Sequence, residues 1–220
     1  MGAPMAQGVN RYAWDLNSTP VVSFPGMILW GATQNGPMVL PGSYTVRLTA
    51  DGATQTQSFS IAKHPLRPIS DADLQYQWDL ASRIRDKVNE ANRAVINIRR
   101  IKGEITARTK EAPKEVQDAG AKLALSLSAV EGEVYQVRNQ SGQDPLNFPI
   151  KTNNRLASLL RVAVTGEGRP TGNVEAIFND LITELKGHTD QLDRTLATEL
   201  AAFNRMLQRN KKEPISPTPK

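Results

Sequence analysis

Cysteine is absent from this 220-residue chain, and histidine occurs only twice, at His64 and His188. The absence of cysteine excludes disulfides, thiolate nucleophiles and cysteine-based zinc sites. No run of about 18 apolar residues occurs, so the sequence predicts no membrane span. Residues 1–7 carry neither a charged nor an apolar signal region, and no signal peptide is expected in the chain as given.

The charge is modest and mixed. Apolar residues make up 39% and charged residues 22% of the chain, which is typical of a globular protein, and the net charge is +5. In the second half most basic residues alternate with acidic ones, as on a solvated helix surface, instead of clustering on one face. We therefore expect no nucleic-acid partner.

Motifs that carry chemistry are missing. The sequence contains no glycine-rich phosphate loop, no nucleophile elbow and no paired histidines at helical spacing. Carboxylates at Asp180 and Glu184, or at Asp190 and Asp193, share a helix face, but that face is the polar one. His188 lies on an apolar stripe and is interpreted as a core histidine with a polar neighbour. The sequence predicts no enzyme, no catalytic residue, no metal site and no cofactor.

A β pattern fills the first 63 residues. Residues 42–50 alternate apolar and polar side chains, Asp51-Gly52 favours a tight hairpin turn, and residues 54–61 return as a β-branched strand. Residues 11–16 and 27–30 are further strand candidates. An immunoglobulin-like sandwich needs about seven strands, so the sequence predicts a partial one.

A helical pattern follows a proline-containing linker. Ser70 is a typical helix N-cap, and apolar residues at spacings of three and four predict a helix from 70 to about 108. Similar stripes predict a second helix after Pro113, a shorter one over 151–164 and a long one from about 171 to 208. Because such coiled-coil-like stripes must be buried, these helices are expected to form an antiparallel bundle.

Two tryptophans are candidate ligand-binding residues. Trp14 and Trp30 lie in the β region, where exposed indoles would stack against the apolar faces of sugars. The alternative interpretation is that both fill a small β core, as aromatic residues at strand spacing usually do. The exposure of the two rings distinguishes these interpretations.

Several motifs in a consistent order resemble a known family. They are residues 8–16 (GVNRYAWDL), 24–31 (FPGMILWG), 40–48 (LPGSYTVRL), 71–74 (DADL), 84–91 (IRDKVNEA), 146–157 (LNFPIKTNNRLA) and 202–204 (AFN). The series is similar to the C-terminal region of bacterial exported β-propeller proteins of the sortilin-like, Asp-box-repeat type, often labelled glycosyl hydrolases. The resemblance implies an immunoglobulin-like module, and a propeller upstream that would carry any hydrolytic site. It implies no catalytic residue in this chain.

The sequence thus predicts a multi-domain α and β protein. A partial immunoglobulin-like β-sandwich (8–63) is joined by a linker (64–69) to an antiparallel three- to four-helix bundle (70–209), and a disordered tail (210–220) follows. The predicted function is that of a non-catalytic accessory or assembly region, a fragment of a longer propeller protein. The alternative is a carbohydrate- or protein-binding module that acts alone.

The expected partners are an upstream β-propeller or another protein chain, and a homo-oligomer is left open. The resemblance implies a periplasmic or extracellular location, and a stand-alone chain would be cytoplasmic.

Overall fold

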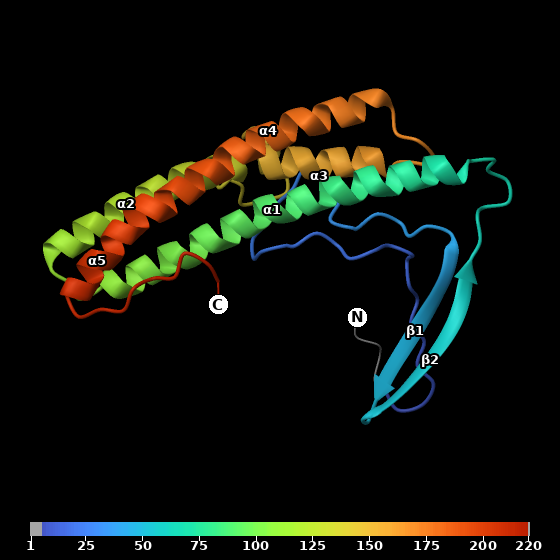
Figure 1. The fold of residues 1–220 in the computed structure, drawn as a ribbon, viewed down its shortest axis with the longest axis horizontal. Coiled ribbons are helices and arrows are strands. Elements are labelled where there is room, and N and C mark those ends of the chain that lie inside the picture. The colour runs from blue at the N-terminus through green and yellow to red at the C-terminus, as the bar shows by residue number, and fades with distance from the viewer. Residues whose placement is uncertain (1–5, 220) are drawn as a thin grey trace.

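Long helices dominate the computed structural model, which describes residues 6–219 (Figure 1). Helix α1 (Asp71–Thr109) spans the molecule, about 59 Å at 1.5 Å per residue. Its N-cap is Ser70, whose hydroxyl oxygen accepts a hydrogen bond from the backbone N–H of Asp73, and acidic residues occupy its first turn. The start and end of this helix agree with the sequence prediction to within one or two residues.

The other helices complete a bundle that is three helices thick. Helix α2 (Lys114–Val134) lies along the C-terminal half of α1, and α3 (Thr152–Ala163) along its N-terminal half. A long last helix covers both: α4 (Gly172–Thr195), a π-helical turn η2 (Leu196–Leu200) and α5 (Ala201–Arg209). Helices α2 and α3 therefore act as one helix that is interrupted by residues 135–151, which include the short 3₁₀ turn η1 (Asp144–Leu146).

The apolar stripes of these helices meet in one core. Ile84, Val88, Ile98 and Ile101 of α1 are fully buried, as is Leu127 of α2. The last helix adds Phe178, Leu185, Leu200 and Leu207, among others. The helical part of the prediction is confirmed, because the apolar stripes of α1, α2 and the last helix are buried together.

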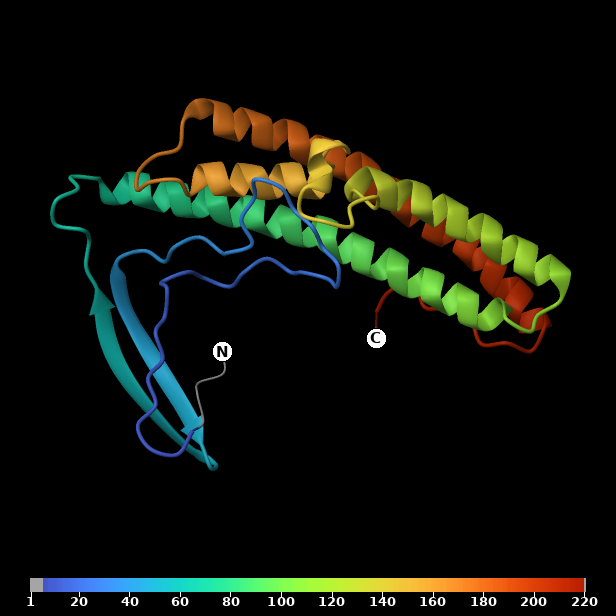
Figure 2. The same cartoon turned by 180° about the vertical axis from the view of Figure 1, so that it is seen from behind.

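A β-hairpin projects from one end of the bundle (Figure 2). Strands β1 (Gly42–Ala50) and β2 (Ala53–Ile61) pair antiparallel without a bulge, from Ala50 opposite Ala53 to Gly42 opposite Ile61. Asp51 and Gly52 both have positive φ, 49° and 79°, as a two-residue hairpin turn requires. The predicted hairpin is confirmed.

The predicted partial immunoglobulin-like sandwich is wrong. Among residues 6–219 the only sheet is this two-stranded one, and the strand candidates at 11–16 and 27–30 are irregular. Residues 21–30 instead lie against the helices, and Val21 and Phe24 belong to the helical core. Within the described residues no neighbouring strand forms hydrogen bonds with the backbone of residues 21–30. Side chains of the helices form such hydrogen bonds instead.

Polar side chains of the bundle hold this extended segment. Asn89 accepts a hydrogen bond from the N–H of Val22 at 2.6 Å, and Asn92 donates to its carbonyl at 2.7 Å. Asn154 binds both backbone groups of Trp30 in the same way, at 2.7 and 2.8 Å. The segment 21–30 is thereby fixed as part of the bundle and not of a separate β domain.

The C-terminal residues are also ordered against the bundle, contrary to the predicted disordered tail. After Arg209 the chain reverses at Lys211, which has a φ of 57°, and runs back along α1 and α5. Ile215 is 1% exposed. The three prolines of this segment suggested disorder, but an extended strand lying in a groove suits proline equally well. The last residue, Lys220, lies outside the described residues.

Candidate functional site

The outer edges of the hairpin are its most accessible backbone groups. The two-residue turn makes Ala50 and Ala53 a hydrogen-bonded pair, and every second pair from there is also hydrogen-bonded. The residues between these pairs point their N–H and C=O groups outward. On β1 these residues are Ser43, Thr45, Arg47 and Thr49, and on β2 they are Thr54, Thr56, Ser58 and Ser60. Within the described chain no other strand pairs with either edge.

The hairpin also exposes apolar side chains. Val46 is 53% and Leu48 56% exposed, and both lie on the face that Phe59 shares. The opposite face is lined by hydroxyls, two of which, on Thr49 and Thr54, lie 3.0 Å apart. A two-stranded hairpin is marginally stable by itself, because it buries little apolar surface. The arrangement is that of a sheet which lacks a neighbour.

Trp14 and Trp30, the two candidate ligand residues, lie against different elements. Trp14 is half-buried and packs edge-on against Tyr44 and Phe59 of the hairpin, at centroid distances of 6.0 and 6.4 Å. Its indole N–H donates to the carbonyl of Asn17. Trp30 is 39% exposed, and its backbone is bound by α3. The rings that Trp14 contacts are those of Tyr44 and Phe59. They do not include Trp30, so the two indole rings are not in contact with each other.

A cavity of about 380 Å³ lies where the base of the hairpin meets the start of α1. Leu16, Val39, Leu74 and Trp78 supply apolar walls, and residues 61–64 and Arg67 line it as well. The cations at its rim are already paired: Lys63 lies 2.9 Å from Asp71, and Arg67 lies 3.7 Å from Glu167. These two ion pairs join the linker after β2 to the first residue of α1 and to the loop between α3 and α4.

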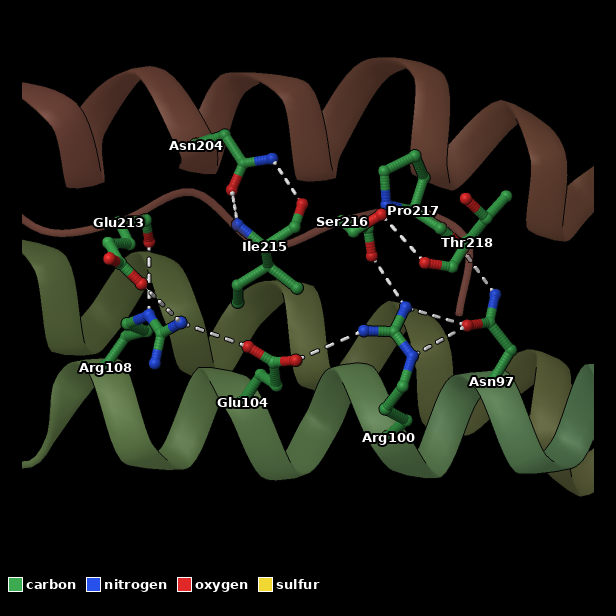
Figure 3. Close-up of polar contacts among 10 residues, drawn as sticks. All are labelled: Asn97, Arg100, Glu104, Arg108, Asn204, Glu213, Ile215, Ser216, Pro217 and Thr218. Atoms are coloured by element: carbon green, nitrogen blue, oxygen red, sulfur yellow. Dashed lines mark hydrogen bonds and ion pairs between the residues drawn. The ribbon is translucent and has the colours of Figure 1, made fainter. Parts of the chain in front are cut away.

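The C-terminal segment occupies a groove between α1 and α5 (Figure 3). Asn204 binds both backbone groups of Ile215, each at 2.8 Å. From α1, Arg100 donates to the carbonyl of Ser216 at 2.6 Å and Arg108 to that of Glu213 at 3.1 Å. These hydrogen bonds go to backbone groups of the segment and do not depend on its side chains. The buried side chain of Ile215 is the apolar anchor of the segment.

Glu104 sets the spacing of the two arginines in this groove. Its carboxylate oxygens lie 3.2 Å from a guanidinium nitrogen of Arg100 on one side and of Arg108 on the other (Figure 3). Such one-turn pairs on a helix hold long side chains in a single orientation. Arg100 and Arg108 both bind the C-terminal segment of the same chain, so the contact is structural.

Shifted pKa values belong to structural contacts as well. The hydroxyl of Tyr76 donates to Glu175 at 2.6 Å, and this bond raises the pKa of the tyrosine and lowers the pKa of the carboxyl. For Glu184, burial raises the pKa, but hydrogen bonds from Thr152 and Arg155 outweigh it and leave the pKa lowered. Both carboxyls join α4 to a neighbouring helix, Glu175 to α1 and Glu184 to α3.

The side chain of His188 is 20% exposed and lies 4.0 Å from Glu184, so it has the predicted polar neighbour but is only partly buried and lies at the margin of the core. The Nδ1 atom of His64 accepts a hydrogen bond from the N–H of Leu66 within the linker. In the part of the chain that the structure describes, no three histidine, aspartate or glutamate side chains gather as a metal site would require. No helix in that part is both long and apolar enough to cross a membrane.

The residues that sequence reasoning missed are the asparagines. Asn92 and Asn153 are fully buried and joined at 3.1 Å, and Asn154 is nearly so. The signal in the sequence was their position beside or on apolar helix stripes, where a polar residue requires a buried partner.

Comparison of the chain with protein-family models, with curated proteins and with solved structures finds no match.

Proposed function

We propose that this chain is a non-catalytic accessory and assembly region of a larger protein, in which the bundle is a rigid support and the hairpin is a strand-pairing site. The observation that carries the proposal is the hairpin: within residues 6–219 its outer edges pair with no other strand, and apolar side chains are exposed on one face of its two nine-residue strands. Edge strands are ordinarily blunted by charge, proline or a bulge, because a bare edge pairs with other chains.

The attachment of the hairpin supports a role as a docking element. At its base, residues 16–18 pair antiparallel with residues 37–39 through two backbone bonds of 2.8 Å. After the other strand, the ion pairs of Lys63 and Arg67 join the linker to Asp71 of α1 and to Glu167 of the α3–α4 loop. Because the chain is attached both before β1 and after β2, the hairpin has less freedom to reorient. This lowers the entropy cost of binding a partner.

The resemblance to the C-terminal region of exported β-propeller proteins suggests the identity of the larger protein. The proposed partner for β1 is a β strand of that upstream region, because within the described residues β1 pairs with β2 alone. A non-catalytic role is supported by the structural use of the shifted carboxyls described above.

Sequencing the gene upstream of the Met1 codon tests the propeller part of the proposal. An open frame that encodes Asp-box repeats is expected, and a stop codon directly upstream would overturn it.

Hydrogen exchange then tests strand pairing in the longer protein. The amides of Thr45 and Arg47 should exchange at least tenfold more slowly there than in this chain, while those of Tyr44 and Val46, which face β2, serve as controls. Equal exchange of all hairpin edge amides in both proteins would refute the docking role.

A further inference from the structure

The outer edge of β2 has none of the features that keep strand edges apart. Residues 53–61 contain no charged residue and no proline, and the register with β1 runs without a bulge. On β1, by contrast, the outward set includes Arg47. Charged side chains and bulges are the usual protection of an exposed edge, so the two edges of this hairpin differ in kind.

From this edge we infer that β2 pairs antiparallel with β2 of a second copy of the chain, which would give a continuous four-stranded sheet across a two-fold axis. The inference rests on the proposed assembly function and names a partner for it. Two-fold dimers are the commonest closed assemblies, and their interface must be self-complementary.

The sequence of β2 meets the condition of self-complementarity. Full overlap of the two strands centres the axis on Gln57, so that Thr54 lies opposite Ser60 of the partner subunit and Thr56 opposite Ser58 of the partner subunit. All of these are outward residues, so each pair exchanges both of its backbone hydrogen bonds.

The side chains fit the same register. On one face hydroxyls lie opposite hydroxyls, as Thr49 and Thr54 already do within the hairpin. On the other face Gln55 lies opposite Phe59 of the partner subunit, and no charge meets a like charge. The charged residues that give the net charge of +5 lie outside residues 53–61, so β2 brings no charged side chain to the interface.

No helix lies beside β2 among the described residues. Figures 1 and 2, which view the molecule from opposite sides, both show β2 on the outer side of the hairpin, away from the helices. Residues 53–60 are all exposed.

The absence of cysteine allows a direct test of the register. In Gln57→Cys the two introduced thiols face each other across the axis in a non-hydrogen-bonded pair, where Cα atoms are about 4.5 Å apart, a distance that a disulfide spans. Mild oxidation should convert most of this variant to a covalent dimer. Gln55→Cys, on the same strand and face, is the matched control and should remain uncross-linked.

Light scattering of the unmodified chain over a concentration series should show a rise from 24.1 kDa to twice that mass. Thr56→Pro removes an outward N–H of β2 and should lower the association constant at least tenfold, whereas Thr45→Pro, on the β1 edge, should leave it unchanged. Circular dichroism confirms that both variants keep their helices.

A monomer at every concentration, or cross-linking of Gln55→Cys in preference to Gln57→Cys, would overturn the inference. The proposed function would survive either result if the edge amides of Thr45 and Arg47 were still protected in the longer protein.

Discussion

Asparagine side chains join the irregular segments of this protein to its helices. Asn154 and Asn204 each bind both the N–H and the C=O of a single residue, Trp30 and Ile215. An amide side chain can do this because it carries a donor and an acceptor side by side, as a neighbouring strand would. The same buried amides explain why a chain with so few strands can hold long extended segments.

Glu131 illustrates how a buried charge is compensated at the residue scale. Its side chain is 5% exposed and lies 2.6 Å from Arg99 and 3.0 Å from Lys102. Glu131→Ala should lower the free energy of unfolding by about 2 kcal/mol, less than for a fully buried pair because both cations are one-third exposed and can turn to water. Urea unfolding measures this. Glu133→Ala, which removes a carboxylate that is 58% exposed, is the control and should change stability by less than about 1 kcal/mol.

The pKa of Glu184 leads to a prediction about acid. The folded protein lowers this pKa, so the carboxylate stabilises the fold above its unfolded pKa, and this contribution is lost as the pH falls through the folded pKa. Glu184→Gln should therefore be less stable than the unmodified chain near neutral pH and should lose less stability between about pH 5 and pH 3. Melting temperatures across that range test it, and parallel curves for the two proteins would contradict the assignment.

At the scale of elements, Gly120 of α2 lies close against α1. A Cβ atom there would lie 2.8 Å from Cγ2 of Thr109 and 3.1 Å from Cγ2 of Ile105, both on α1. A Cβ on Gly132, in the same helix, would meet nothing within 4 Å. One helix thus contains a glycine required by packing and another that packing does not require.

This contrast gives substitutions of opposite sign. Gly120→Ala should destabilise the protein by about 1–3 kcal/mol through overpacking. Gly132→Ala should stabilise it by up to about 1 kcal/mol, because alanine has the higher helix propensity. Thermal unfolding of both variants tests the α1–α2 contact, and a stabilising Gly120→Ala would show that the helices can separate at no cost.

The docked C-terminal segment gives a second prediction at this scale. Ile215→Ala should lower stability by at most about 2 kcal/mol, because the segment can undock locally before the bundle unfolds. The amide of Ile215 should exchange faster in this variant. Leu66→Ala, at a side chain that is 85% exposed, is the control. Unchanged exchange at Ile215 would contradict the role of its side chain as the anchor.

At the scale of the whole molecule, the N-terminal segment packs into the core of the helices. Phe24 packs edge-on against Tyr135 at a centroid distance of 5.0 Å, and Arg99 lies over both rings. The hydroxyl of Tyr135 donates to the carbonyl of Gly26 at 3.0 Å and lies 3.1 Å from the N–H of Ile28, from which it accepts. The segment therefore fills the gap where α2 ends and α3 has yet to begin.

Phe24→Ala should consequently lower the melting temperature of the helices, at a cost of about 3 kcal/mol in stability. The measurement is the helical circular dichroism signal, which an independent β domain would leave unchanged. Val46→Ala, on the exposed hairpin, is the control and should leave the helical transition where it is.

The amino-acid sequence by itself determined the helices, their ends and the hairpin, because these depend on local signals. Ser70 caps α1, Asp51-Gly52 accepts positive φ, and apolar stripes at spacings of three and four require burial. The destination of residues 21–30 and 213–217 was not determined locally, since extended backbone can be satisfied equally well by a strand or by side chains. The tertiary structure decided it by placing Asn89, Asn92, Asn154 and Asn204 where those backbone groups pass, and so replaced the predicted sandwich with a single hairpin on a helical bundle.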